Sequence, residues 1–274
     1  MKGEKIIKKE KVTAVILTAT TLCGAFSFAS CGGEKREVRL AGSTSVAPLM
    51  GDLAEAYMAL HGEVEIVISE GGSAVGIANA KEGKGDFGMA SKAVSEEGVT
   101  SVKICDDGIV VVTNKDNELT DVTGVQLYDF FAYGTAIGNI TLPIARNESS
   151  GTRDAFEELV KNAAGKKLKE ETSRASNTKV FDGTGAVLVE VQTNKAGLGY
   201  ISLGSYDGSV KKLSFNGVEA TAENIKNGDY QLSRPFVLLY NSQNGLSEEA
   251  QAFLDFVLSD EGQAIIEESG YITL

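Results

Sequence analysis

The chain repeats one short pattern three times: an apolar strand, a turn rich in Gly, Ser and Thr, and then an amphipathic helix. The expected strands are 37–41, 63–69 and 140–144, and the turns that follow them are 42–48, 70–77 and 146–153. Strands that alternate with helices are typical of α/β layers with a largely parallel sheet. The pattern therefore predicts an α/β fold in which several helices begin at the carboxyl ends of strands.

The third turn has the features of an anion site. Ser149 and Ser150 can cap the helix that follows, and Gly151 allows the backbone to approach a ligand. The first-turn N–H groups of such a helix lack partners and carry partial positive charge. Arg146 precedes them and offers a planar fork to an oxyanion. Glu148 stands among these donors, which makes sense if the anion carries a proton that needs an acceptor. The alternative for this turn alone is a capped helix with surface charges.

The N-terminus has the pattern of an export signal. A basic segment at 1–11 is followed by an uncharged apolar run at 12–30 and then by Cys31. Residues 28–31 resemble a bacterial lipobox, although Phe28 departs from the usual Leu. We therefore expect a lipoprotein-type signal peptide at 1–30, lipidation of Cys31, and a tether at 31–36. An uncleaved membrane anchor is the alternative, because the run is just long enough to span a bilayer.

Both alternatives place the domain outside the cytoplasm, and the lipid anchor would hold it on the outer face of the cytoplasmic membrane. Removing residues 1–30, which carry five Lys and two Glu, changes the formal charge from −12 to −15. So acidic a chain argues against nucleic acid as a partner. A small anion in a closed cleft stays compatible with it, because remote charges are screened over about 8 Å.

Cysteine and histidine are too few for two common kinds of site. Cys105 would be the one cysteine left in the mature chain besides the lipidated Cys31, so no intramolecular disulfide framework is expected. His61 is the single histidine, and we expect it on the surface rather than at a metal. The sequence therefore predicts neither a metal site nor a cofactor site.

The rest of the chain continues the alternation of strands and helices. We expect further strands at 86–92, 110–112, 197–202 and 235–240, helices at 125–131 and 186–193, a hairpin at 210–220 that turns at Asn216-Gly217, and one long helix at 247–267. No long linker separates these elements. We therefore expect two lobes joined by crossing strands, with 37–112 plus 229–274 in the first lobe and 113–228 in the second.

Several segments together resemble the phosphate-binding protein of bacterial phosphate ABC transporters. In chain order they are 42–46, 86–91, 107–111, 146–153, 197–200 and 253–263. The resemblance covers essentially the whole mature chain. It implies a two-lobed periplasmic-binding-protein fold, in which each lobe is a mostly parallel sheet flanked by helices and the cleft lies between the lobes. It also implies hinge closure and no catalytic activity.

The resemblance further implies that phosphate is held between the lobes by hydrogen bonds. By position, the binding residues would be Thr44, Ser45, Ser73, Ser91, Arg146, Glu148, Ser150, Gly151 and Thr152. Glu148 would accept the proton of phosphate and repel sulfate, which has none. Ser91 stands where some members have Asp, so recognition of the ligand's proton by an acceptor would be weaker at that point. The implied partners are inorganic phosphate and the permease subunits, and we expect a monomer.

Other functions remain open at this point. The chain could bind another tetrahedral oxyanion, such as sulfate, molybdate or tungstate, or it could be a phosphate-sensing lipoprotein without transport. A phosphatase that uses Ser150 would need a base, and His61 lies in an unrelated element. Arg153 is a weaker candidate for the site than Arg146, because it can pair with Glu157 one helical turn later.

Overall fold

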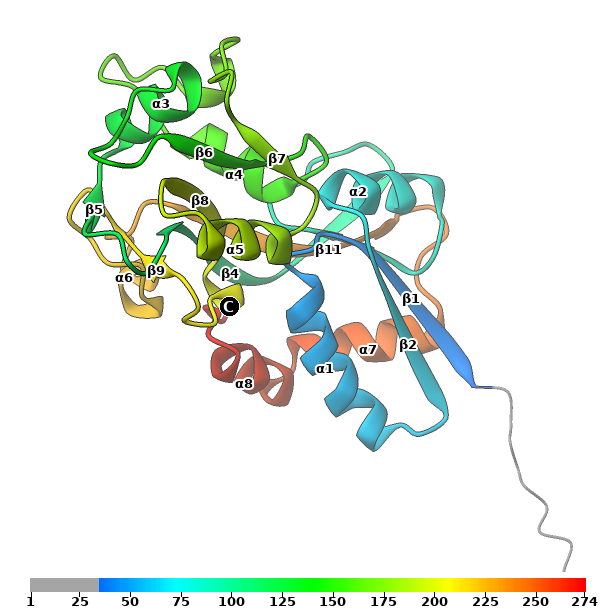
Figure 1. Ribbon diagram of the computed structural model, residues 1–274. Coiled ribbons are helices and arrows are strands. Elements are labelled where there is room, and N and C mark those ends of the chain that lie inside the picture. Colours follow the sequence, from blue (N-terminus) through cyan, green and yellow to red (C-terminus); the bar gives the residue numbers. More distant parts are fainter. Residues whose placement is uncertain (1–34) are drawn as a thin grey trace, which may run out of the picture. The chain divides into compact units, whose positions relative to one another are not determined.

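Residues 35–274, the part of the chain that the computed structural model describes, form alternating strands and helices around one mixed sheet (Figure 1). The predicted signal peptide, the lipidation site Cys31 and the tether up to residue 34 lie outside the described residues. Within 35–274, no helix combines the length and the apolar character needed to cross a membrane. The strand–turn–helix units predicted from the sequence are all present.

The elements have the following bounds. The strands are β1 (Arg36–Gly42), β2 (Val64–Glu70), β3 (Phe87–Ala90), β4 (Val99–Thr113), β5 (Asp121–Val122), β6 (Leu142–Arg146), β7 (Lys179–Phe181), β8 (Gly197–Ser202), β9 (Lys211–Lys212), β10 (Ser214–Phe215) and β11 (Ser233–Asn241). The helices are α1 (Ala47–Leu60), α2 (Ser73–Glu82), α3 (Gly124–Tyr133), α4 (Gly151–Leu159), α5 (Thr184–Thr193), α6 (Ala222–Lys226), α7 (Glu248–Leu258) and α8 (Asp260–Glu268), with short 3-10 turns η1 (Leu168–Glu170) and η2 (Leu203–Ser205).

Two long strands connect two parallel groups of strands. The nine-stranded sheet has the order β2-β1-β3-β11-β4-β8-β6-β7, with β9 beside β4. Among the described residues, every ladder that involves neither β4 nor β11 is parallel. The first part of β4 pairs with β11 up to Gly108, and the rest pairs with β8 from Ile109 onward, both antiparallel. β4 thus passes from one group of strands to the other.

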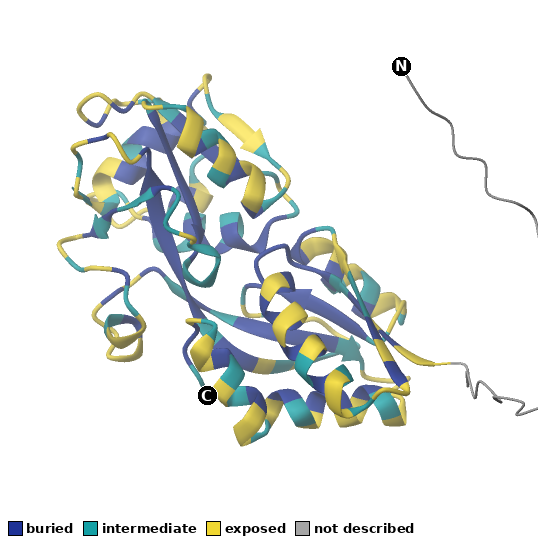
Figure 2. Ribbon diagram, turned by 60° about the horizontal axis from the view of Figure 1, so that its bottom comes forward, coloured by how far each residue is buried: buried dark blue, intermediate teal, exposed yellow. Residues whose placement is uncertain are grey.

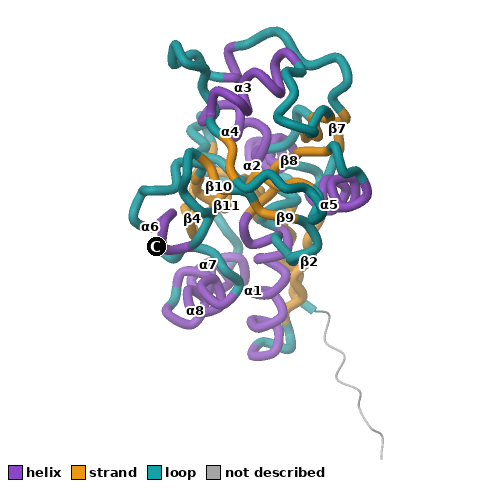
Figure 3. Tube along the Cα trace, turned by 60° about the vertical axis from the view of Figure 1, so that its left-hand side comes forward, coloured by secondary structure: helices purple, strands orange, loops and turns teal. Residues whose placement is uncertain are grey.

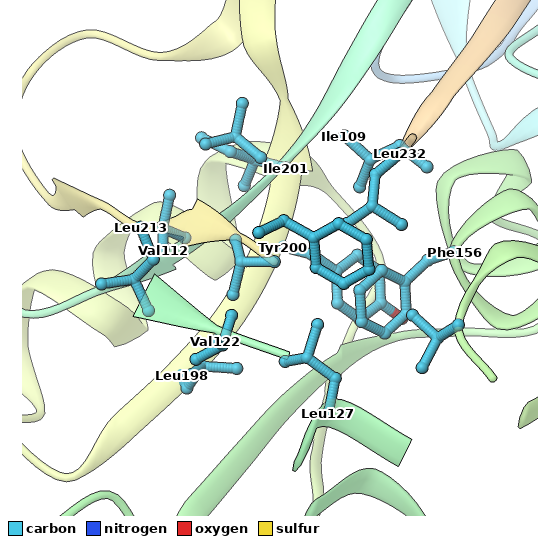
Figure 4. Packing of buried hydrophobic residues seen from close by; sticks show 14 of the residues in the cluster. Ile109, Val112, Val122, Leu127, Phe156, Leu198, Tyr200, Ile201, Leu213 and Leu232 are labelled. Atoms are coloured by element: carbon cyan, nitrogen blue, oxygen red, sulfur yellow. The ribbon is translucent and has the colours of Figure 1, made fainter. Parts of the chain in front are cut away.

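The buried side chains form two main cores, one on each side of this passage (Figure 2). The first core combines α1, α7 and α8 with β1, β2, β3 and β11, and Figure 3 shows these three helices lying together. The second core combines α3, α4 and α5 with the end of β4, β6 and β8. Its centre is aromatic: the rings of Phe156 and Tyr200 stack with centroids 4.0 Å apart (Figure 4).

Side-chain alternation gives the first group of strands two covered faces. Phe87 and Met89 of β3 join the core under α1 and α7, whereas Ala90 joins a small cluster with Ala80 of α2. On β11, Phe236 and Leu238 face the first of these clusters and Val237 and Leu239 face the second, because successive strand residues point to opposite faces. Helices therefore cover both faces of this half of the sheet.

A buried ion pair lies where the core changes along both connecting strands. Asp107 of β4 accepts bonds from Arg234 of β11, with Asp107 Oδ2 3.0 Å from Nη2 and 3.2 Å from Nε. Asp107 Oδ1 also accepts from Ser202 Oγ at 2.7 Å and from Leu203 N at 3.2 Å. Burial raises the pKa of the Asp107 carboxyl, and the charge of Arg234 opposes that rise. The pair fixes β4, β11 and the end of β8 to one another.

The predicted long helix at 247–267 is two helices. α7 ends at Leu258, and Ser259 has extended backbone with ψ 165 before α8 begins. Ser259 Oγ accepts from Gly262 N at 3.2 Å, which caps the second helix. A Cβ at Gly262 would lie 2.2 Å from the carbonyl oxygen of Phe256, so only glycine allows the two helices to meet this closely. The apolar residues keep a helical period across Ser259, so the sequence pattern gave no sign of the break between α7 and α8.

The predicted hairpin at 210–220 is wrong except at its turn. Asn216 and Gly217 both have positive φ, and Phe215 and Val218 exchange backbone bonds across them. The flanking residues, however, pair elsewhere: β9 joins β4, and β10 runs parallel to β5. The prediction of a turn at Asn216-Gly217 is confirmed, but β9 and β10 pair with strands that are distant in the sequence.

The ion pair between the connecting strands gives a stability prediction. We expect Arg234→Met to lower the free energy of unfolding by about 3–5 kcal/mol, because Asp107 would stay buried without its cation. Urea unfolding measures the change. Arg39→Met is the matched control, since Arg39 pairs with Glu37 on the exposed surface, and its effect should be much smaller. Equal losses in the two variants would contradict the prediction.

Candidate functional site

The turns before α1, α2 and α4 meet in one buried polar cluster. We call it the donor cluster, and its members are Ser43, Thr44, Ser45, Ser73, Ser91, Arg146, Ser150, Gly151, Thr152 and Thr184. All of them are buried, and Thr44 is the most exposed side chain among them at 9%. The cluster draws on both halves of the molecule, because 43–91 belong to elements of the first core and 146–184 to elements of the second.

Glycine allows the first two turns to approach each other. Gly42 ends β1 with φ +140, and a Cβ there would lie 2.3 Å from the carbonyl oxygen of Met89. The carbonyl oxygen of Gly42 accepts from Gly71 N at 2.9 Å and from Gly72 N at 2.8 Å. These bonds hold the turn after β2 against the turn after β1, so that Ser73 begins α2 beside Ser91 with 3.3 Å between the hydroxyl oxygens.

The two sides of the cluster touch. Ser45 Oγ lies 2.8 Å from Thr152 Oγ1, and Ala74 N donates to the carbonyl oxygen of Ser149 at 3.1 Å. A Cβ at Gly151 would lie 2.2 Å from Ser73 Oγ. The structure therefore shows the halves in a closed arrangement, in which any side chain on Gly151 would separate them.

Arg146 is a buried cation that no carboxylate neutralises by direct contact within the described residues. It is 2% exposed, and burial lowers its pKa to about 10. Its Nη1 donates to Thr184 Oγ1 at 3.1 Å, and its Nη2 donates to Thr44 Oγ1 at 2.9 Å and to the carbonyl oxygen of Asp182 at 2.7 Å. Its Nε has no partner among the residues described. A buried cation that no carboxylate neutralises favours an anionic ligand.

Helix N-termini add further donors. Ser150 Oγ accepts from Arg153 N at 3.2 Å and caps α4, which leaves its own O–H free to donate. α2 and α5 begin after Gly72 and Gly183, which have no side chain to cap them. First-turn N–H groups without a cap can donate to an anion, and the helix dipole favours negative charge there, although Ala74 N of α2 already donates to the carbonyl oxygen of Ser149.

The structure brings together eight of the nine residues predicted for the site. Thr44, Ser45, Ser73, Ser91, Arg146, Ser150, Gly151 and Thr152 all belong to the donor cluster. Glu148 does not: it lies exposed in the turn between β6 and α4. The turn directs residue 148 toward solvent while Arg146 and Ser150 face inward. A role for Glu148 in reading the ligand's proton stays a prediction, and its position does not favour that role.

The sequence analysis missed Ser43 and Thr184. Ser43 Oγ donates to Ser91 Oγ at 3.0 Å, and Thr184 Oγ1 lies 3.3 Å from Ser45 Oγ. The signal for Thr184 was present, because 179–184 is again a strand, a glycine turn and the start of a helix. A cavity of about 430 Å³ adjoins the cluster at Thr44, and Glu70, Asn147 and Asp182 contribute to its walls.

Several charged residues near the cluster are paired. Arg153 Nε bonds Glu157 Oε1 at 2.8 Å, which confirms the pair predicted along α4. Lys92 Nζ lies 2.6 Å from Asp154 Oδ2 and so joins the end of β3 to α4.

His61 stacks on Tyr57 of α1 with ring centroids 4.3 Å apart. Within residues 35–274, no group of three or more His, Cys, Asp or Glu side chains could hold a metal ion.

Comparisons with known proteins agree with the fold described above. A family model described as a PBP superfamily domain matches residues 29–261. The phosphate-binding protein PstS of Staphylococcus epidermidis is 30% identical to the chain, over 97% of this chain and 89% of that protein. A crystal structure of a phosphate ABC transporter substrate-binding protein from Clostridium perfringens, described as putative and with bound phosphate, is 37% identical with a TM-score of 0.80, and covers 87% of this chain and all of that one.

Other relatives match over a shorter stretch. The phosphate-binding protein PstS 2 of Streptococcus agalactiae is 42% identical over 136 residues. That match spans 48% of this chain and 45% of the relative, so the chain covers about half the length of this curated protein.

The buried charge of Arg146 gives a second stability prediction. We expect Arg146→Met to raise the free energy of unfolding of the ligand-free protein by about 1 kcal/mol, because an unneutralised buried cation is replaced by an apolar side chain of similar length. Urea unfolding in a buffer without oxyanions measures it. Arg153→Met is the control, and we expect a loss there, since Arg153 has a carboxylate partner. A clear loss of stability in Arg146→Met would contradict the prediction.

Proposed function

We propose that this chain, which belongs to the PBP superfamily and within it to the PstS family of phosphate-binding proteins, binds inorganic phosphate and delivers it to the permease of an ABC transporter. The observation that carries the proposal is the buried guanidinium of Arg146, which meets hydroxyl groups from both halves of the molecule and has an Nε–H without a partner in the described chain. A small oxyanion would supply the missing negative charge and acceptors.

The proposed ligand shell follows the donor cluster. Thr44, Ser45, Ser73 and Ser91 would contact phosphate from one side, and Arg146, Ser150, Gly151 and Thr152 from the other. Hydroxyl groups and backbone N–H groups satisfy the four oxygens of a tetrahedral anion without adding charge. Because each side contributes donors, phosphate would stabilise the closed arrangement over an open one.

Closure would occur as hinge motion of two lobes about the connecting strands. We place the first lobe at 37–112 plus 229–274 and the second at 113–228, with β4 and β11 as the crossing segments. The change of hydrophobic core between Cys105 and Ile109, and between Leu232 and Phe236, favours crossing points close to Asp107 and Arg234, a few residues away from these predicted boundaries. The permease would recognise the closed form.

The protein would act outside the cytoplasm, as a monomer held on the membrane by lipid on Cys31. It would act by binding alone and not as an enzyme. Ser150 already serves as the cap of α4, and His61 packs on Tyr57 of α1, away from the elements that hold Ser150. A hydrolase would need a base beside its nucleophile.

Hydroxyl groups would also have to accept the hydrogen of protonated phosphate. The buried polar residues of the donor cluster include no carboxylate within the described chain, and a serine or threonine oxygen can accept as well as donate. A hydroxyl can instead turn and donate to sulfate, whereas a fixed carboxylate cannot. Sulfate, molybdate or tungstate therefore remains the alternative ligand, because hydroxyl groups alone do not exclude an oxyanion without a proton.

Calorimetry on the chain from residue 31 onward tests the function. We expect saturable binding of one phosphate, weaker binding of sulfate, and no turnover of a phosphomonoester. Tighter binding of sulfate than of phosphate would overturn the choice of ligand, and hydrolysis of the ester would overturn the non-enzymatic assignment. Growth of a deletion strain on limiting phosphate separates transport from sensing, because only loss of a transport component slows uptake directly.

Gly151→Ala is a binding prediction. The added methyl group would lie within 3 Å of Ser73 Oγ and Ser91 Oγ, so it would hold the halves apart. Overpacking of this kind typically costs about 1–3 kcal/mol, and we therefore expect the Kd for phosphate to rise about 10-fold to 100-fold. The control is Gly51→Ala on α1, where an added Cβ meets nothing within 4 Å. Unchanged affinity in Gly151→Ala would show that the ligand-bound form is more open than this structure.

Glu148→Gln tests the role predicted for Glu148 from the sequence. An exposed carboxylate is screened by water, so we expect the ratio of phosphate to sulfate affinity to stay within about threefold of its original value. If Glu148 turns inward and reads the proton, the ratio should instead fall by orders of magnitude. Paired calorimetric titrations with both anions decide between these results.

A further inference from the structure

We propose that Thr184, the first residue of α5, forms a fourth wall of the anion site and positions Arg146 for the ligand. This inference rests on the proposed binding function and extends it to a residue outside the three turns. Thr184 is 6% exposed, although it lies at a helix start that adjoins the cavity at Gly183. Burial of a hydroxyl at such a place calls for partners.

The hydroxyl of Thr184 links both halves of the molecule. Its Oγ1 accepts from Arg146 Nη1 at 3.1 Å within the second half. The same oxygen lies 3.3 Å from Ser45 Oγ and 3.5 Å from Thr44 Oγ1 in the first half. Since a hydroxyl carries one hydrogen and two lone pairs, Thr184 can accept from Arg146 and still donate toward the cluster.

Strand register explains why Thr184 lies beside Arg146. β6 and β7 run parallel, and Arg146 is paired with Phe181 in their ladder. Asn147 N donates to the carbonyl oxygen of Phe181 at 3.0 Å, which continues the pairing beyond the strand end. The next residues, Asp182 to Thr184, therefore turn over the side chain of Arg146. Asp182 contributes its carbonyl oxygen and Thr184 its hydroxyl.

These contacts orient the guanidinium plane. Thr184 holds Nη1, and the carbonyl oxygen of Asp182 holds Nη2. The Nε–H then remains as the donor without a partner in the described chain. An arginine that is already oriented loses less rotational freedom when it binds an oxyanion, and this favours binding. Without the Thr184 hydroxyl, Nη1 would lose its one side-chain acceptor in the described structure.

Calorimetry with inorganic phosphate tests the inference. Thr184→Val keeps the shape of the side chain and removes the hydroxyl, and we expect the Kd to rise about 10-fold to 100-fold, as for loss of a hydrogen bond to a charged group. Thr184→Ser should bind within about threefold of the original protein. Thr193→Val, the same change at the exposed end of α5, should leave the Kd unchanged.

A spectroscopic readout separates positioning from a purely structural role. In ¹H–¹⁵N spectra of the ligand-free protein, the Nε–H resonance of Arg146, assigned by its loss in Arg146→Lys, should be sharp. It should broaden in Thr184→Val and stay sharp in Thr184→Ser. A sharp resonance in Thr184→Val, or an unchanged Kd, would overturn the role of Thr184. Failure of the unmodified chain to bind phosphate would overturn the proposed function itself.

Discussion

An unneutralised charge in a closed, polar interior is the constraint on which the molecule depends. Arg146 lies at the end of β6, where hydroxyl oxygens and one carbonyl oxygen hold its Nη atoms. These neutral acceptors orient the guanidinium but cannot balance it. Much of the fold follows from this need: glycine turns that approach closely, helices that begin at the cluster, and two halves that meet around it.

The connecting strands β4 and β11 hold together the two halves that meet around Arg146. β4 and β11 carry the chain between two hydrophobic cores, and Asp107 and Arg234 hold these strands together at the passage. This second buried charge is neutralised within the protein, unlike Arg146. The contrast separates two uses of a buried arginine: Arg234 fixes the connecting strands, whereas Arg146 is proposed to serve a ligand.

The sequence predicted what depends on neighbouring residues and failed where the partner is distant. Strands, glycine turns and helix starts follow from local pattern, and the family resemblance pointed to eight residues that the structure gathers in the donor cluster. The break at Ser259 was hidden because the apolar period continues through it. β9 and β10 have partners far along the chain, and Thr184 reaches Arg146 only through the register of β6 and β7. Glu148 is exposed because proximity in sequence does not determine the direction of a side chain in a turn, and its role stays a prediction.

The contact between Ala74 N and the carbonyl oxygen of Ser149 has a consequence for the empty protein. The halves can bond to each other directly, so closure needs no bridging molecule in order to be sterically complete. An unloaded copy that shut in this way would show the permease the same outer surface as a loaded one and would trigger idle transport cycles. Under the proposed function, the isolated positive charge would make the shut, empty form unfavourable and would so link the signal for transport to the presence of cargo.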